Sequence, residues 1–437
     1  MLKLLNPNAL RPPAVATLPT ARPDVRYFDL HGAFIAFDAN GMAAVQLDHA
    51  LWDRAQADPA ALGGLLGATA MPQFPLLSGG GPRKLVLNLT HACNLACRYC
   101  FVKSDKSDRS DLSDPSDIMS PATAREALRL LRGDLDICFF GGEPLLAWET
   151  LVAAVEAAEA LATETRRAAR FHVTTNGVAL TAEKAAFLAA HKFSVLVSCD
   201  GPEPLHNAAR PAKGGANSWR ATMAALDLLR EAGLASVSLR GTFTLDAPRL
   251  RERLVFYGEL LDRGLVRGFS LEPAVITEGC ARRDGGALDA EALADEYHAA
   301  AEWYLARVRA GRPAGFFHFR KLLERLRDAR PQPSECGAGN GYVAVGPAGD
   351  LFACHRETGT HIGRLDIGID EALRARWADN RLYRRRGCLD CFARWVCGGG
   401  CRQHAAELGR PLCEPNETAC AIMQIMVREC LWIMTQT

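Results

Sequence analysis

Short apolar segments and amphipathic segments follow one another in a regular order through the centre of this chain. Apolar runs typical of buried strands lie at 84–89, 137–140, 171–175, 194–198, 236–244 and 268–275. Segments with helical spacing follow them at 121–132, 149–163, 181–191, 217–232 and 248–263. This alternation predicts parallel strands joined by crossover helices, in an α/β barrel or an open sheet. In such folds the functional residues lie at the carboxyl ends of the strands.

The pattern changes on both sides of this region. Residues 1–25 are Pro-rich and aperiodic, which predicts a tail, and 26–70 predict strands followed by a helix. A Gly- and Pro-rich linker at 75–83 follows, and helices at 291–310 and 316–329 lead into a Cys- and Gly-rich region. We therefore expect a tail and small β/α module at 1–80, the α/β domain at 81–275, a helical connector at 276–330 and a cysteine-rich domain at 331–437.

Composition and charge exclude several classes of function. The formal net charge of the 437 residues is +1. The protein as a whole therefore has no strong positive electrostatic potential that would favour nucleic acid or an anionic membrane as a partner. The first twenty residues are too interrupted by Asn and Pro for a signal peptide, and the sequence analysis finds no apolar run long enough to span a bilayer. We expect a cytosolic protein with no nucleic-acid or membrane partner. The charged, low-complexity segment at 103–117 predicts a solvated loop near the site.

The 15 cysteines are unusual for such a protein. In a reducing cytosol, clustered cysteines indicate metal ligands or catalytic groups rather than disulfides. Most of them fall in two groups, at 93–100 and 336–420. The remaining four are interpreted as small buried hydrophobic residues: Cys138, Cys199, Cys280 and Cys430.

The first group follows the first predicted strand directly. Cys93, Cys97 and Cys100 have the spacing C-x3-C-x2-C, with Tyr99 before the last of them. Thiolates bind zinc or iron–sulfur clusters, but a structural zinc site uses four ligands. Three cysteines in one loop fit better with a [4Fe-4S] cluster that leaves one iron open.

This motif, in this position, resembles that of the radical S-adenosylmethionine (SAM) enzymes. The resemblance implies that the open iron binds the amino and carboxylate groups of SAM. It also implies that reductive cleavage of SAM yields a 5′-deoxyadenosyl radical, which abstracts hydrogen from a substrate. An external low-potential electron donor, of the flavodoxin or ferredoxin type, is implied as a partner.

Polar residues at later strand ends match further parts of this family pattern. Glu143, in a Gly-Gly-Glu-Pro turn, offers an acceptor for the ammonium group of SAM, and Arg240 suits its carboxylate. The predicted SAM-binding residues are Tyr99, Gly141, Gly142, Glu143, Asn176, Ser198, Asp200 and Arg240. Glu272, at the end of the sixth strand, is the candidate catalytic base, with a structural salt bridge as the alternative.

The second group of cysteines allows a zinc ribbon but more closely resembles the SPASM extension of radical SAM enzymes that modify peptides and proteins. The resemblance implies two auxiliary [4Fe-4S] clusters, three in all. Carried over by position, the first auxiliary cluster has Cys336, Cys354 and Cys401, and the second has Cys388, Cys391, Cys397 and Cys420. The fourth ligand of the first is Cys413, another residue, or none, and an open iron could bind a substrate thiolate.

The resemblance implies a maturase that acts on a precursor peptide or protein and installs a thioether or carbon–carbon crosslink, with the auxiliary clusters as electron acceptors. Two alternatives stay open: a sulfatase maturase that generates formylglycine, and a non-catalytic metal-binding scaffold. The module at 26–70 either recognises a leader peptide by strand addition or caps the barrel.

Overall fold

The computed structural model describes residues 3–4, 24–58, 66, 69–72, 74, 81–102, 117–274, 289–357, 359–379 and 381–437. Most of the predicted tail and linker, the polar segment up to residue 116, and Cys280 lie outside these residues.

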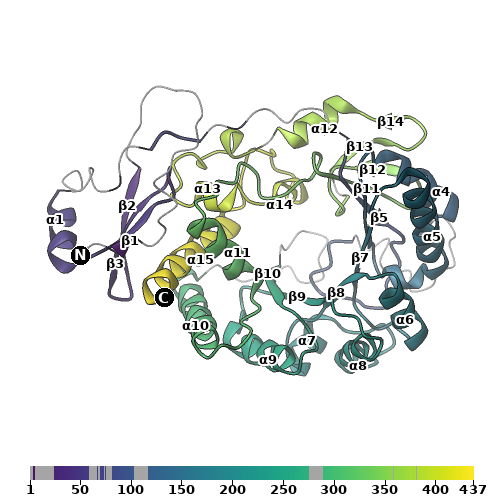
Figure 1. Ribbon diagram of the computed structural model, residues 1–437, viewed down its shortest axis with the longest axis horizontal. Coiled ribbons are helices and arrows are strands. Elements are labelled where there is room, and N and C mark those ends of the chain that lie inside the picture. Colours follow the sequence, from purple (N-terminus) through teal and green to yellow (C-terminus); the bar gives the residue numbers. More distant parts are fainter. Residues whose placement is uncertain are drawn as a thin grey trace.

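A ten-stranded sheet forms the centre of the protein and curves around an interior space (Figure 1). Its first six strands are parallel and lie side by side in chain order, which confirms the predicted α/β fold. These strands are β5 (Lys84–Asn88), β6 (Leu135–Phe140), β7 (Ala169–Thr175), β8 (Ser194–Ser198), β9 (Val237–Phe243) and β10 (Phe269–Pro273). Because β10 ends the order and does not return to β5, the barrel is partial.

Helices cover the outer side of this sheet (Figure 1). They are α4 (Pro121–Ala127), α5 (Trp148–Thr165), α6 (Ala182–Ala190), α7 (Glu203–Ala209), α8 (Ser218–Glu231) and α9 (Leu250–Asp262), with 3-10 turns η4 (Leu128–Leu130) and η5 (Pro144–Leu146). Local sequence explains where several begin, because Ser120, Thr181 and Asn217 each accept a hydrogen bond from a backbone N–H in the first helical turn. The short helix α7 is missing from the sequence prediction.

The C-terminal region continues the central sheet. Strand β11 (Tyr342–Val345) pairs in parallel with β5, and β12 (Asp350–Phe352), β13 (His361–Arg364) and β14 (Gly368–Ile369) follow as antiparallel strands. The sequence analysis predicts none of these four. Their pairing brings the second group of cysteines to the same edge of the sheet as the first.

Helices α10 (Ala290–Arg309) and α11 (Phe317–Arg327) form the predicted connector. The remaining helical elements are α12 (Glu371–Ala378), η6 (Leu382–Arg384), α13 (Arg394–Cys397), α14 (Arg402–Glu407) and α15 (Glu417–Gln436). By length and composition, α15 could cross a membrane, with a mean hydropathy of 1.2. It packs beside α10 and α11 instead, and residues such as Val427 and Leu431 are fully buried.

Among the residues that the structure describes, the N-terminal module contains a four-stranded antiparallel sheet followed by a helix, and the strands and helix at 25–57 agree with the pattern predicted for 26–70. Its elements are β1 (Lys3–Leu4), β2 (Val25–Leu30), β3 (Ala33–Asp38), β4 (Ala44–Leu47) and α1 (His49–Ala57), and the order is β1-β4-β3-β2. The tail prediction is wrong for β1, which pairs with the edge of β4 and so satisfies its backbone groups.

The module packs against the C-terminal region. Strands β2 and β3 contact α15. Buried Arg394 places its two terminal nitrogens 2.6 Å from a carboxylate oxygen of Asp24 and 2.6 Å from the amide oxygen of Asn40. The described contacts therefore link this module to the cysteine-rich domain.

Candidate active site

A cavity of about 610 Å³ lies at the carboxyl ends of the parallel strands. The loops that follow β5 to β10 form one side of it, and residues of the C-terminal region form the other. Its volume falls in the range usual for sites that enclose a small molecule.

The three cysteines of the first group all line this cavity. Burial, with a smaller contribution from the charge of Cys100, raises the pKa of Cys93 to about 11 and that of Cys97 to about 12. The three cysteines lie in one short loop and open into one cavity. This donor set fits a cluster held by three thiolates.

The cysteine loop is held by the segment that follows α7. The backbone N–H of Ala96 donates to Pro211, that of Arg98 to Ala209, and that of Lys213 to Asn94, at 2.9 to 3.0 Å. The Arg210 side chain, at the centre of this segment, has Nη1 3.9 Å from the sulfur of Cys97.

Gly141 and Gly142 line the cavity and also make room for the cysteine loop. The N–H of Gly142 donates to the carbonyl of Thr90 at 2.7 Å. A Cβ at Gly141 would lie 2.3 Å from that carbonyl oxygen, and one at Gly142 would lie 2.3 Å from the carbonyl oxygen of Ala92. The glycines thus allow two backbone segments to touch, and their predicted role in binding SAM stays a prediction.

Gly141→Ala tests this close approach of the two backbone segments. We expect it to lower the free energy of unfolding by at least about 2 kcal/mol, because φ is positive and the new Cβ meets backbone. Chemical denaturation measures this change. Gly133→Ala is the matched control, since a Cβ there meets nothing within 4 Å. Equal stabilities of the two variants would contradict the prediction.

Glu143 lies beneath the cavity wall. Its carboxylate accepts hydrogen bonds from Thr175 Oγ1 at 2.7 Å and from the N–H groups of Leu145 and Asn176 at 3.0 and 2.7 Å. Burial raises the pKa of Glu143 although these donors lower it. The Asn176 side chain, which does line the cavity, donates to Asn94 Oδ1 at 2.7 Å and so supports the cysteine loop.

Asp200 is fully buried and joins two residues of the cavity wall. Its carboxylate forms an ion pair with Arg210, whose Nε lies 2.9 Å from Oδ1, and accepts a hydrogen bond from the hydroxyl of Tyr99. The Arg210 guanidinium also lies 5.3 Å from the centre of the Tyr99 ring. Burial lowers the pKa of Arg210, but the charges of Asp200, Tyr99 and Cys97 outweigh it, so the pKa is raised and the side chain stays cationic.

We predict that Asp200→Asn lowers the free energy of unfolding by about 3–5 kcal/mol, because it leaves the Arg210 charge buried without its partner. Denaturant unfolding of the reconstituted protein measures this loss. Asp134→Asn, in the exposed pair with Arg170, provides the control and should change stability little. A similar small change for both variants would refute the buried pair as a stabilising contact.

Ser198, Arg240 and Glu272 all line the cavity, as their predicted roles require. The Glu272 carboxylate lies 3.3 Å from Nε2 of His318. Burial raises its pKa, but His318, Arg240 and His404 outweigh burial and lower it to about 2.

The electrostatic effects among the C-terminal cysteines follow the two predicted sets. Cys336, Cys354 and Cys401 line the cavity. Burial, with smaller contributions from the charges of Cys401 and Cys336, raises the pKa of Cys354 to about 11. The hydroxyl of Tyr342 lies 3.6 Å from the Cys354 sulfur, and Arg402 Nη2 lies 3.5 Å from that of Cys336.

The second set contains Cys388, Cys391, Cys397 and Cys420. Burial, and after it the charges of Cys388 and Cys391, raise the pKa of Cys420 to about 11. Burial, with smaller contributions from the charges of Glu335, Cys420 and Cys388, raises the pKa of Cys397 to about 12. Cys413 is not among the cavity-lining residues, and its backbone carbonyl accepts from Arg386 beside this second set.

Two loops join the cysteine groups across the sheet. Asn88, at the end of β5, donates to the carbonyl of His355 at 2.8 Å and to Glu357 at 2.6 Å. Nε2 of His91 lies 2.9 Å from the other oxygen of Glu357. The loop before Cys93 and the loop after Cys354 are therefore held together.

Several residues of the cavity wall are absent from the sequence prediction: Arg210, Lys213, His318, Tyr342, His355 and His404. Burial lowers the pKa of His355 to about 3 and that of His404 to about 4, so both imidazoles are neutral at neutral pH. Arg210 lies twelve residues after the end of the strand predicted at 194–198, and that position was the one available signal.

Known proteins match much of this chain. Residues 87–245 match the model of the Radical SAM superfamily. The serine-type anaerobic sulfatase-maturating enzyme of Klebsiella aerogenes is 26% identical over 73% of this chain and 79% of its own length. Among solved structures, anSMEcpe with bound AdoMet has a TM-score of 0.66 at 18% identity and covers 82% of this chain and 98% of its own. SuiB of Streptococcus suis, bound to its precursor peptide SuiA, has a TM-score of 0.55 at 14% identity, with coverage of 92% and 99%.

Proposed function

Because this chain belongs to the radical SAM superfamily and is an enzyme of the maturase type, we propose that it modifies a precursor peptide or protein by SAM-dependent hydrogen abstraction. The finer product we propose is an intrapeptide crosslink, either thioether or carbon–carbon. The relatives support an enzyme that modifies a peptide or protein. The proposal that the product is a crosslink rests on the residues of the site.

One observation carries the proposal. The first cysteine group and both C-terminal sets contribute to a single cavity of about 610 Å³, through residues such as Cys97, Cys354 and Cys420. A substrate side chain in that cavity would therefore lie between the site of SAM cleavage and the proposed electron acceptors.

The radical SAM domain implies a [4Fe-4S] cluster and SAM. Cys93, Cys97 and Cys100 would hold that cluster, which when bound supplies the electron that cleaves SAM. Tyr99, Asn176, Ser198 and Arg240 are the proposed SAM contacts on the cavity wall. We propose that Glu143 and Asp200 act from behind that wall, by holding Asn176 and Tyr99 in place.

We further propose that the two C-terminal sets hold auxiliary clusters, so that the protein carries three in all. Cys336, Cys354 and Cys401 supply three ligands to the first of them. Tyr342, whose hydroxyl lies 3.6 Å from the Cys354 sulfur, is placed to donate a hydrogen bond to a ligand sulfur. The burial-raised pKa of Tyr342 keeps its phenol protonated for that role.

Glu272 is better suited to electrostatic positioning than to proton abstraction. Its pKa of about 2 makes the carboxylate a weak proton acceptor at neutral pH. We propose that it pairs with His318 and presents a negative charge to the substrate, in line with the salt-bridge alternative.

The proposed partners are a precursor peptide or protein and an external low-potential electron donor, and the proposed location is the cytosol. The test has two parts. Anaerobically reconstituted protein with SAM and dithionite should form 5′-deoxyadenosine. Co-expression with short peptides encoded beside the gene should give one whose mass falls by two hydrogens. Iron-loaded protein that forms no 5′-deoxyadenosine would refute the proposal.

A second candidate function is formylglycine formation in a sulfatase, favoured by the similarity to a sulfatase-maturating enzyme. Oxidation of serine to formylglycine also removes two hydrogens, so mass alone does not separate the products. An aldehyde-reactive hydrazide labels formylglycine and leaves a crosslink unlabelled. Protection of a substrate cysteine from iodoacetamide identifies the thioether.

A further inference from the structure

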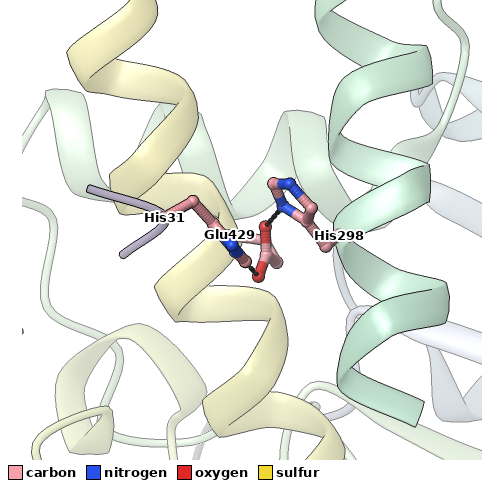
Figure 2. Close-up of side chains that lie close together, drawn as sticks. All are labelled: His31, His298 and Glu429. Carbon is pink, nitrogen blue, oxygen red and sulfur yellow. Dashed lines mark hydrogen bonds and ion pairs between the residues drawn. The ribbon is translucent and has the colours of Figure 1, made fainter. Parts of the chain in front are cut away.

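Three side chains with metal-binding atoms meet at the junction between the N-terminal module and the C-terminal helix (Figure 2). His31 lies in the turn between β2 and β3, His298 lies on α10, and Glu429 lies on α15. One ligand atom from each lies within 4.8 Å of the other two. None of the three lines the cavity described above.

Their separations are close to those of a metal site. Nε2 of His31 is 3.2 Å from Oε1 of Glu429, and Nδ1 of His298 is 2.9 Å from Oε2. Ligands about 2.0–2.1 Å from a tetrahedral zinc ion lie about 3.3 Å from one another. Binding therefore requires mainly that the two imidazole nitrogens approach each other and converge on the ion.

The charges at this junction also favour a cation. The side chain of Glu429 is only 6% exposed, and a buried carboxylate is costly unless a positive charge balances it. The two imidazole rings are stacked, with centroids 3.4 Å apart and an interplanar angle of 22°. One divalent ion bound between them would balance the carboxylate charge.

Neighbouring side chains border the two rings. Oε1 of Glu302, one turn after His298, lies 4.0 Å from the ring nitrogen that faces away from Glu429, which is beyond hydrogen-bond distance. Trp432 contacts both imidazoles edge-on, at 5.9 and 4.8 Å between centroids. The side chain of His31 is 41% exposed, which gives an ion and a water ligand access from solvent.

We propose that His31, His298 and Glu429 bind one divalent transition-metal ion of the zinc class, with an open position for water. Two imidazoles and one carboxylate are a donor set that suits Zn²⁺. The ion would tie the β2–β3 turn of the N-terminal module to α10 and α15. This proposal does not depend on the proposed catalytic function.

The test uses the holoprotein with its iron–sulfur clusters loaded, because empty cysteine sites would also take up zinc. After treatment with a mild chelator and addition of Zn²⁺, gel filtration and metal analysis should give about one zinc per chain. X-ray absorption at the zinc edge should show only nitrogen and oxygen ligands at about 2.0–2.1 Å and no sulfur at about 2.3 Å.

Two variants test the residues, and a third is the control. His31→Gln, in an exposed turn, and His298→Gln should each weaken zinc binding at least about 100-fold. His361→Gln removes an exposed histidine 3.7 Å from Asp350 and should bind zinc as the unaltered protein does. Zinc that is ligated by sulfur, retained equally by His31→Gln and His298→Gln, or not retained by the unaltered protein would overturn the proposal.

Discussion

Cys97→Ala is expected to abolish SAM cleavage. The three thiols of the first group lie in one loop and line one cavity, so we propose that they act as one donor set. Mutation of residues that only hydrogen-bond to metal ligands already lowers metal affinity or activity about 10–100-fold. We therefore expect loss of a direct ligand to reduce 5′-deoxyadenosine formation by at least about 100-fold. Anaerobic assay with SAM and dithionite, followed by chromatography, measures this rate.

Cys138→Ala is the matched control for this experiment. Cys138 is a half-buried cysteine on β6 outside both groups, and it is not among the cavity-lining residues. The control should keep both its iron content and its rate of SAM cleavage. If Cys97→Ala retained the activity of the control, the assignment of the first group would be wrong.

Cys397→Ala is expected to separate SAM cleavage from peptide modification. Cys397 belongs to the second C-terminal set, with Cys388, Cys391 and Cys420. We expect this variant to lose the iron of that set and to form at least about 100-fold less modified peptide. 5′-Deoxyadenosine should still form, because the first cysteine group is intact. Iron analysis and mass spectrometry of the peptide measure the two effects.

Cys413→Ala tests the remaining ambiguity in the first auxiliary set. Since Cys413 is not among the cavity-lining residues and its backbone bonds to Arg386, we expect this variant to keep its iron and its product. Iron loss equal to that of Cys336→Ala would instead make Cys413 the fourth ligand.

For the Cys397→Ala experiment, a peptide that is still fully modified by the variant would refute the proposed role of the second set.

Sequence periodicity predicts the six parallel strands well, because each is a short apolar run bounded by helical spacing. The strands of the C-terminal region could not be predicted in this way. Strand β11 has four residues, and its partner β5 lies more than 250 residues earlier, so no local pattern reports their pairing.

In the candidate site, too, a local sequence pattern predicts some residues and misses those that tertiary packing brings in. Spacing alone identifies Cys93, Cys97 and Cys100, because all three lie in one loop. It misses Arg210 and Tyr342, which reach the sulfurs of Cys97 and Cys354 through tertiary packing. The His31, His298 and Glu429 cluster draws one residue from each of three distant elements, so it has no sequence motif at all.

The pairing of β11 with β5 has a consequence for synthesis on the ribosome. Residues 89–341 separate the two strands, so β11 emerges roughly 13–50 s after β5 at 5–20 residues per second. During that interval the nascent chain would expose one edge of a hydrophobic parallel sheet, which is a template for aggregation. Production of the protein should therefore depend on chaperones and on slow, cool expression.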